Sequence, residues 1–87
     1  MTLAFPNQSR FYDTTRQAVR FWGYDSAMEW SFFVNEDTLR HIQPDLCVDE
    51  AGALAAFDRN VDRIHAAAMR AYGRGRKGSY DLMAADF

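Results

Sequence analysis

The stretch from Asp49 to Gly73 constrains the fold of this chain more than any other part of the sequence. Its apolar residues recur every three or four positions, a spacing that keeps them on one side of an α-helix. These residues are Leu54, Phe57, Val61, Ile64, Ala68, Ala71 and Tyr72. The opposite side collects Arg59, Asp62 and Arg63 and therefore carries charges of both signs. The pattern predicts one long amphipathic helix whose apolar side must be buried.

Both ends of this predicted helix carry residues that suit them. Asp49 fits the N-cap position, where a side-chain oxygen accepts a hydrogen bond from a free backbone N–H. At the other end, Arg70 and Arg74 suit the negative pole of the helix dipole, and Gly73 suits a left-handed conformation after the last turn. Gly52 weakens the first turn, so the start of the helix is less well defined than its end.

Strands are predicted before this helix. Residues 18–24 and 28–34 alternate between two sides and are rich in aromatic side chains, which predicts a β-hairpin with its turn at residues 23–26. A shorter strand is expected to begin at Phe11 and Tyr12 and to turn back through residues 13–15.

The remaining segments complete the predicted order of elements. Asn35 is placed to cap a short helix that Pro44 ends, and residues 44–48 link it to the long helix. After a glycine-rich segment, residues 79–83 predict a final strand that joins the sheet. Residues 84–87 predict a last helical turn, with the ring of Phe87 closing over the core.

This order predicts an α+β fold. A small, mainly antiparallel sheet, formed by the β-hairpin and the final strand, would carry the short helix and the long helix packed on one face. Residues 1–87 are expected to form a single domain, with residues 1–10 as a loosely ordered N-terminal arm because Pro6, Asn7 and Ser9 favour turns and extended chain. Domains of this layout host many functions, so the layout alone predicts none.

Composition and charge narrow the classes of function. Hydrophobic residues make up 48% of the chain and aromatic residues 15%, so a folded core is expected without a metal. The net charge is −2, which excludes binding of nucleic acid or of anionic membranes through the field of the whole molecule. No apolar run approaches the roughly 20 residues needed to cross a bilayer. The single Cys47 and the lack of a signal-peptide pattern at the start predict a soluble, cytoplasmic protein.

An aromatic group on the predicted hairpin is the first candidate site. Trp22, Tyr24, Trp30 and Phe33 cannot all point into one core, because side chains alternate along a strand. The outward members are either shielded by the N-terminal arm or presented to a partner, and the sequence favours neither. Tryptophan and tyrosine are enriched at binding hot spots.

A basic segment after the long helix is the second candidate site. Arg70, Arg74, Arg76 and Lys77 lie near two tyrosines and among glycines that would let a phosphate backbone approach. The simpler interpretation is that these charges complement the helix C-terminus and keep the loop soluble, and we favour it.

No catalytic, cofactor-binding or metal-binding residues are predicted. His41, His65 and Cys47 lack the paired spacing of a compact metal site, and a border histidine such as His65 usually pairs with a carboxylate. Asp58 and Asp62 are interleaved with arginines and fit surface ion pairing better than acid–base chemistry.

Three segments resemble a family of short bacterial proteins catalogued as domain of unknown function 1488. They are VRFWGYD at 19–25, LAAFDRNVDRIHAAAMRAYGRG at 54–75 and GSYDLMAADF at 78–87. The resemblance covers nearly the whole chain and implies a compact α+β bacterial domain with no established activity. It therefore supplies no catalytic residues. Val61 stands where the family often has an arginine, and here it belongs to the apolar side of the helix.

Two functional hypotheses follow. The first is a non-enzymatic protein-interaction or regulatory module that binds an unknown protein partner or forms a homo-oligomer through the aromatic hairpin. The alternative is a weak nucleic-acid-binding protein that uses the basic loop at residues 70–78. Salt separates the two, since phosphate binding weakens steeply with added salt and apolar contacts do not.

Overall fold

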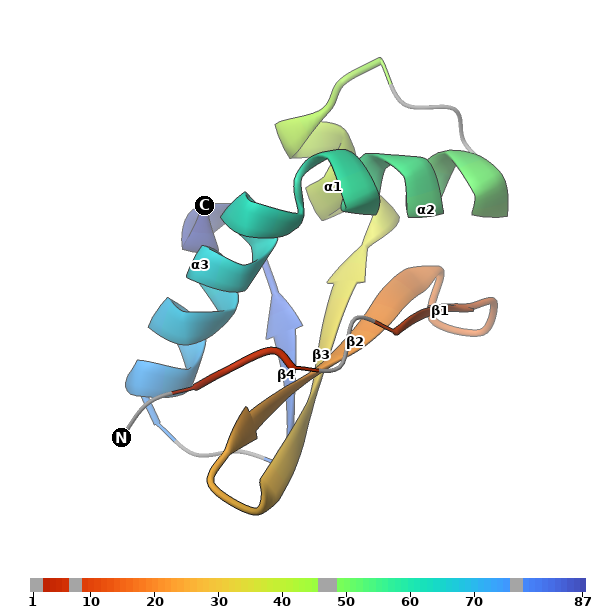
Figure 1. Cartoon of the computed structure of the whole chain (residues 1–87). Helices are drawn as coiled ribbons and strands as arrows, with labels where there is room; N and C mark the ends of the chain where they lie inside the picture. Colours follow the sequence, from red (N-terminus) through yellow and green to blue (C-terminus); the bar gives the residue numbers. More distant parts are fainter. Residues whose placement is uncertain (1–2, 7–8, 46–48, 76–77) are drawn as a thin grey trace.

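The computed structural model describes residues 3–6, 9–45, 49–75 and 78–87. Its elements follow in the order β1 (Arg10–Asp13), β2 (Ala18–Asp25), β3 (Met28–Asn35), α1 (Glu36–Ile42), α2 (Glu50–Arg59), α3 (Val61–Gly73), β4 (Ser79–Leu82) and the 3-10 turn η1 (Ala84–Asp86). The helices lie on one side of the sheet and leave its other face open (Figure 1). The predicted α+β class and the one-sided packing of the helices are confirmed.

Within the described residues, the sheet has four strands in the order β1-β2-β3-β4. The first three strands form an antiparallel meander, and β4 joins parallel to β3. The mainly antiparallel sheet and the final strand are confirmed. The predicted turn at residues 23–26 begins too early, because Gly23 and Tyr24 pair with Trp30 and Glu29 inside the hairpin. The chain reverses at Ser26, whose φ is 56°.

The prediction of one long helix is wrong, because the helix is interrupted at Asn60. The N–H of Asn60 lies 3.2 Å from the carbonyl oxygen of Ala56 and 3.1 Å from that of Phe57, so this turn is tighter than an α-helix. The side chain of Asn60 also donates to the carbonyl oxygen of Ala56 and to Oε1 of Gln43. This amide competes with the backbone for hydrogen bonds, so α2 and α3 run in different directions across the sheet (Figure 1).

The helix ends agree with the sequence only in part. Oδ1 of Asp49 accepts a hydrogen bond from the N–H of Gly52 at 2.6 Å, and Oδ1 of Asn35 accepts one from Thr38 at 2.8 Å, so both N-caps are confirmed. The left-handed conformation predicted for Gly73 is wrong, since Gly73 is the last residue of α3. The positive φ falls two residues later, at Gly75 with 153°.

The core lies between the helices and one face of the sheet. Four residues of the predicted apolar side are buried there, and Phe87 packs against the core as expected. They are Phe57, Ile64, Ala68 and Tyr72. The sheet contributes the alternate residues of its strands, which are Val19, Phe21, Phe32, Val34, Tyr80 and Leu82. This alternation fixes which side chains are left for the opposite face.

The described part of the N-terminal arm is held more firmly than the sequence suggests. Ala4 and Tyr24 exchange two backbone hydrogen bonds of 2.8 Å, so the arm continues the sheet beyond β1. Leu3 is buried in the core, and the ring of Phe5 stacks on that of His65 with 3.9 Å between centroids. Residues 1–2 and 7–8 of the predicted arm lie outside the described residues.

The arm fits because Gly23 has no side chain. A Cβ atom at this position would lie 3.0 Å from side-chain atoms of Leu3, Phe5 and Phe32. We therefore expect Gly23→Ala to lower the free energy of unfolding by about 1 kcal/mol, which urea denaturation would measure. The matched control is Gly73→Ala, a helical position where the added Cβ would have no atom within 4 Å apart from its chain neighbours and the backbone of its own helix, so alanine should be neutral or stabilising. Equal effects at the two glycines would contradict the close packing at Gly23.

Candidate functional site

The face of the sheet turned away from the helices carries the candidate site, and we call it the open face. Strand register places Phe11, Arg20, Phe33 and Asp81 in one row across the four strands. Paired residues of neighbouring strands point to the same side of a sheet, so these side chains share the open face. The rows beyond add further members, which are Trp22, Ser31, Tyr24 and Glu29.

Two arginines lie over the aromatic rings of this face. The guanidinium carbon of Arg16, from the turn between β1 and β2, is 3.9 Å from the ring centroid of Phe33. Arg20 is 5.2 Å from the ring of Trp22 and 5.6 Å from that of Phe33, and its Nη2 atom donates to Oγ of Ser31 at 2.9 Å. Both arginines are within the range of cation–π attraction. The two arginines cover the ring of Phe33, which is only 6% exposed although no helix lies over it.

Phe11, Trp22 and Tyr24 are the aromatic side chains of the open face that remain at least partly accessible among the described residues. Phe11 is 58% exposed, although it lies in a strand beside Arg20, and Trp22 is half-buried. Farther along the face, the hydroxyl of Tyr24 donates to Glu29 at 2.5 Å. Of the four aromatic residues singled out in the sequence, Trp22, Tyr24 and Phe33 are on this face. Phe11 was missed as a site residue, because its orientation depends on the register of β1.

Trp30 lies on the other side of the sheet. It alternates with the open-face residues of β3 and packs half-buried against the core. Its ring centroid is 5.8 Å from that of Tyr72 and 6.4 Å from that of Tyr80. The structure thus separates Trp30 from Trp22, and a surface partner on the open face would not meet Trp30.

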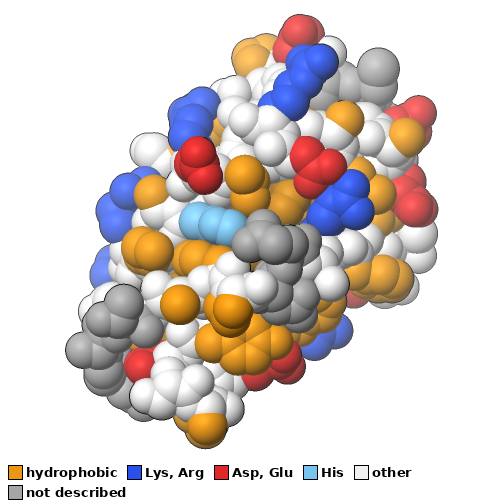
Figure 2. All heavy atoms as spheres, viewed as in Figure 1, with side chains coloured by type: hydrophobic (Ala, Val, Ile, Leu, Met, Phe, Trp, Pro, Cys, Tyr) orange, Lys and Arg blue, Asp and Glu red, His pale blue; other side chains and the backbone are white. Residues whose placement is uncertain are grey.

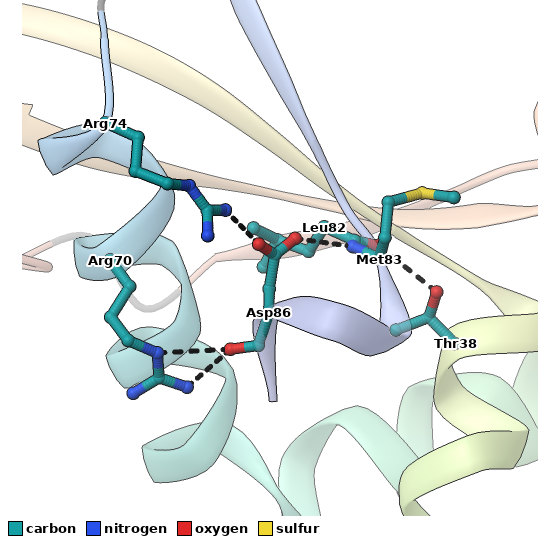
Figure 3. A network of polar contacts seen from close by, with 6 residues as sticks. All are labelled: Thr38, Arg70, Arg74, Leu82, Met83 and Asp86. Atoms are coloured by element: carbon teal, nitrogen blue, oxygen red, sulfur yellow. Dashed lines mark hydrogen bonds and ion pairs between the residues drawn. The ribbon is translucent and has the colours of Figure 1, made fainter.

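The described arginines of the basic loop make contacts within the domain, to Asp86 near the end of the chain (Figure 3). Arg74 forms an ion pair with the buried carboxylate of Asp86, and Arg70 donates from Nε and Nη2 to the carbonyl oxygen of the same residue. The backbone N–H of Met83 donates to the other carboxylate oxygen of Asp86 at 2.7 Å. These contacts fix η1 against α3. Arg76 and Lys77, the other two residues predicted for anion binding, lie outside the described residues.

The surroundings of Asp86 change its acidity. Burial raises the pKa of this carboxyl, but the hydrogen bond from Met83 and the charges of Arg74 and Arg70 outweigh burial. The net result is a pKa below the ordinary value of 3.8. Asp86 is therefore ionised at neutral pH and suits a structural role better than proton transfer.

A small hollow of about 150 Å³ lies at the start of α1. It is lined by Arg16, Gln17, Asn35, Glu36 and Asp37. Three of the polar side chains around it already have partners: Asn35 caps α1, Asp37 pairs with Arg40, and Glu36 accepts from the hydroxyl of Tyr12. The hydrogen bond to Glu36 is the main cause that raises the pKa of Tyr12 to about 12. This hollow is a shallow polar depression of the surface, and its side chains are not arranged around a ligand.

The described candidates for metal or acid–base chemistry do not come together. Among the described residues, no group of three metal-ligating side chains exists. His65 is half-buried under Phe5, and burial lowers its pKa while Asp62 raises it to a smaller extent. Asp58 receives both hydrogen bonds of a bidentate ion pair from Arg10 of β1, so it ties α2 to the sheet. Cys47 lies outside the described residues.

Acidic and basic side chains are interspersed over the face seen in Figure 2, with hydrophobic side chains between them. This mixed surface agrees with the small net charge of −2. None of the described helices combines the length and the hydrophobicity required of a membrane span.

The fold and the candidate site define a small two-layer α+β domain with one open sheet face. The family model "Protein of unknown function (DUF1488)" matches residues 3–83, and the chain belongs to this family. A solved structure of a protein of unknown function from the same family, from Shewanella loihica PV-4, superposes with a TM-score of 0.82. It is 17% identical and the match covers 94% of each chain, so it shows a shared fold. No curated protein matches the chain.

Proposed function

We propose that this protein is a non-enzymatic interaction module of the bacterial cytoplasm that binds a protein partner through the open face. The observation that carries the proposal is the exposure of Phe11, which is 58% accessible in a paired strand next to Arg20. Arg20 and the half-buried Trp22 lie on the same face, and arginine and tryptophan are residue types enriched in binding hot spots.

The second hypothesis, binding of nucleic acid by the basic loop, receives less support. Arg70 donates from Nε and Nη2 to the carbonyl oxygen of Asp86, and Arg74 pairs through Nη2 with its carboxylate, so part of their donor capacity is used within the domain. A phosphate that binds Arg74 would approach the ionised carboxylate of Asp86, a like charge that repels it. Nucleic-acid binding would appear as captured material that a nuclease removes.

Affinity capture from a lysate of the host cell, with half of the lysate treated with nuclease, tests the proposal. We expect the same captured proteins in both halves, and a loss of about tenfold or more in their yield for Phe11→Ser and for Trp22→Ala. Met69→Ser is the matched control, since Met69 is 48% exposed but lies on α3, away from the open face.

Circular dichroism of each variant should show an unchanged fold, because the substituted side chains lie outside the core. Capture that is equal for the wild type and both open-face variants would refute the proposal. Material that disappears after nuclease treatment would move the site to the basic loop instead.

A further inference from the structure

We propose that the protein partner of the open face is a second copy of this chain, packed face to face. The two copies are related by a two-fold axis that lies between the two sheets and crosses the strands at the level of Trp22 and Ser31. This inference rests on the proposed function and names its partner. Trp22 and Ser31 are a registered pair at the centre of the hairpin, so an axis at their level exchanges the two ends of the open face.

The centre of the face is suited to such packing. Phe11 and Trp22 offer accessible aromatic surface, and Phe33 is already closed off beneath its arginine. Helices cover only one side of the sheet, and a second sheet is the usual cover for an open, partly apolar sheet face. Two sheets stack at about 10 Å, a separation that two layers of aromatic and arginine side chains fill.

The charged side chains of one open face complement those of a second copy related by this axis. On β3, Phe33, Ser31 and Glu29 follow at steps of two residues, about 7 Å each, with Arg16 lying over Phe33 at one end. A two-fold axis at Ser31 brings Arg16 opposite the partner's Glu29, and the symmetry repeats this contact. One face therefore supplies a cation and an anion at matching distances from its centre.

In the single chain, the guanidinium of Arg16 is still partly available for a contact with the partner's Glu29. Its side chain is 43% exposed, and its ion pair with Asp81 is long at 3.5 Å. Glu29 is exposed at the end of the hairpin. On β2, the same axis places Arg20 opposite the partner's Tyr24, a cation over an aromatic ring, and Trp22 opposite the partner's Trp22. Arg16 thus meets a carboxylate and Arg20 an aromatic ring, so neither arginine is set against a like charge.

Sedimentation equilibrium over a wide range of protein concentrations tests the inference. We expect the wild-type chain to dimerise, and Arg16→Glu alone or Glu29→Arg alone to weaken dimerisation by about tenfold or more, since each creates two like-charge contacts. The double variant Arg16→Glu with Glu29→Arg should regain most of the lost affinity because the pair is only exchanged. Arg63→Glu and Asp62→Arg, which make the same charge changes on α3, should leave dimerisation unchanged.

Urea denaturation of each variant checks the fold, and Glu29→Arg keeps the test valid if Arg16→Glu does not fold. A wild-type chain that stays monomeric would overturn the inference. If capture of another protein by that monomer still depends on Phe11, the proposed function stands without self-association. A dimer that none of the open-face variants weakens would place the interface elsewhere and also overturn the inference.

Discussion

Replacing Trp30 with alanine is expected to lower the free energy of unfolding by about 3 kcal/mol, the lower end of the range for truncating a buried aromatic side chain. The half-buried indole packs between Tyr72 and Tyr80 on the helix side of the sheet. Its Nε1 atom is buried without a hydrogen-bond partner in the described part of the chain, so lost packing sets the cost. Urea denaturation at low protein concentration would measure it.

Trp22→Ala is the natural comparison, because it removes the same side chain from the neighbouring strand. We expect it to cost about 1 kcal/mol, since the ring loses its contact with Arg20 but leaves no cavity in the core. The two tryptophans thus separate a residue that stabilises the fold from one that is available to a partner. Equal losses, or a larger loss at Trp22, would contradict the orientation of the two side chains.

Asp86→Asn is expected to lower the free energy of unfolding by about 2 kcal/mol at neutral pH, the value of a hydrogen bond to a charged group. The amide keeps the shape of the side chain but loses the charge that attracts Arg74 and strengthens the bond from Met83. The ion pair itself contributes little to this figure, because the side chain of Arg74 is exposed. Asp45→Asn, an exposed carboxyl in a turn, is the control and should change stability by less than about 0.5 kcal/mol.

The loss of unfolding free energy caused by Asp86→Asn should become smaller as the pH falls. The folded pKa of Asp86 is below the unfolded value near 3.8, so the carboxylate stabilises the fold fully above that value and loses its contribution as pH falls through the folded pKa. The difference between the wild type and Asp86→Asn should be constant from pH 7 to about pH 5 and should shrink below about pH 4. A difference that stays constant down to acid pH would show that the charge of Asp86 does not stabilise η1.

Short-range patterns predicted much of the fold. Alternation in residues 18–24 and 28–34 was enough to predict the hairpin and its two faces, and N-caps at Asn35 and Asp49 were marked by side chains that act locally. The interruption at Asn60 escaped prediction because the apolar spacing continues through it without a gap. An asparagine inside an alanine-rich helix was the available signal, since its amide competes for backbone hydrogen bonds.

The candidate site was less predictable, because its members depend on contacts between distant segments. Which of Trp22 and Trp30 faces outward follows from where the helices pack, and alternation alone cannot give that answer. The exposure of Phe11 depends on the register of β1 with β2. No local pattern indicated that Arg70 and Arg74 of the basic loop contact Asp86.

The parallel pairing of β4 with β3 also divides the assembly of the sheet into two unequal steps. Strands β1, β2 and β3 are joined by short turns, so their pairing closes small loops at little entropic cost. Ser79 reaches its partner Ser31 only after the chain has passed through α1, α2 and α3. This pairing therefore closes the longest loop of the sheet, and we expect the meander to form before β4 joins it.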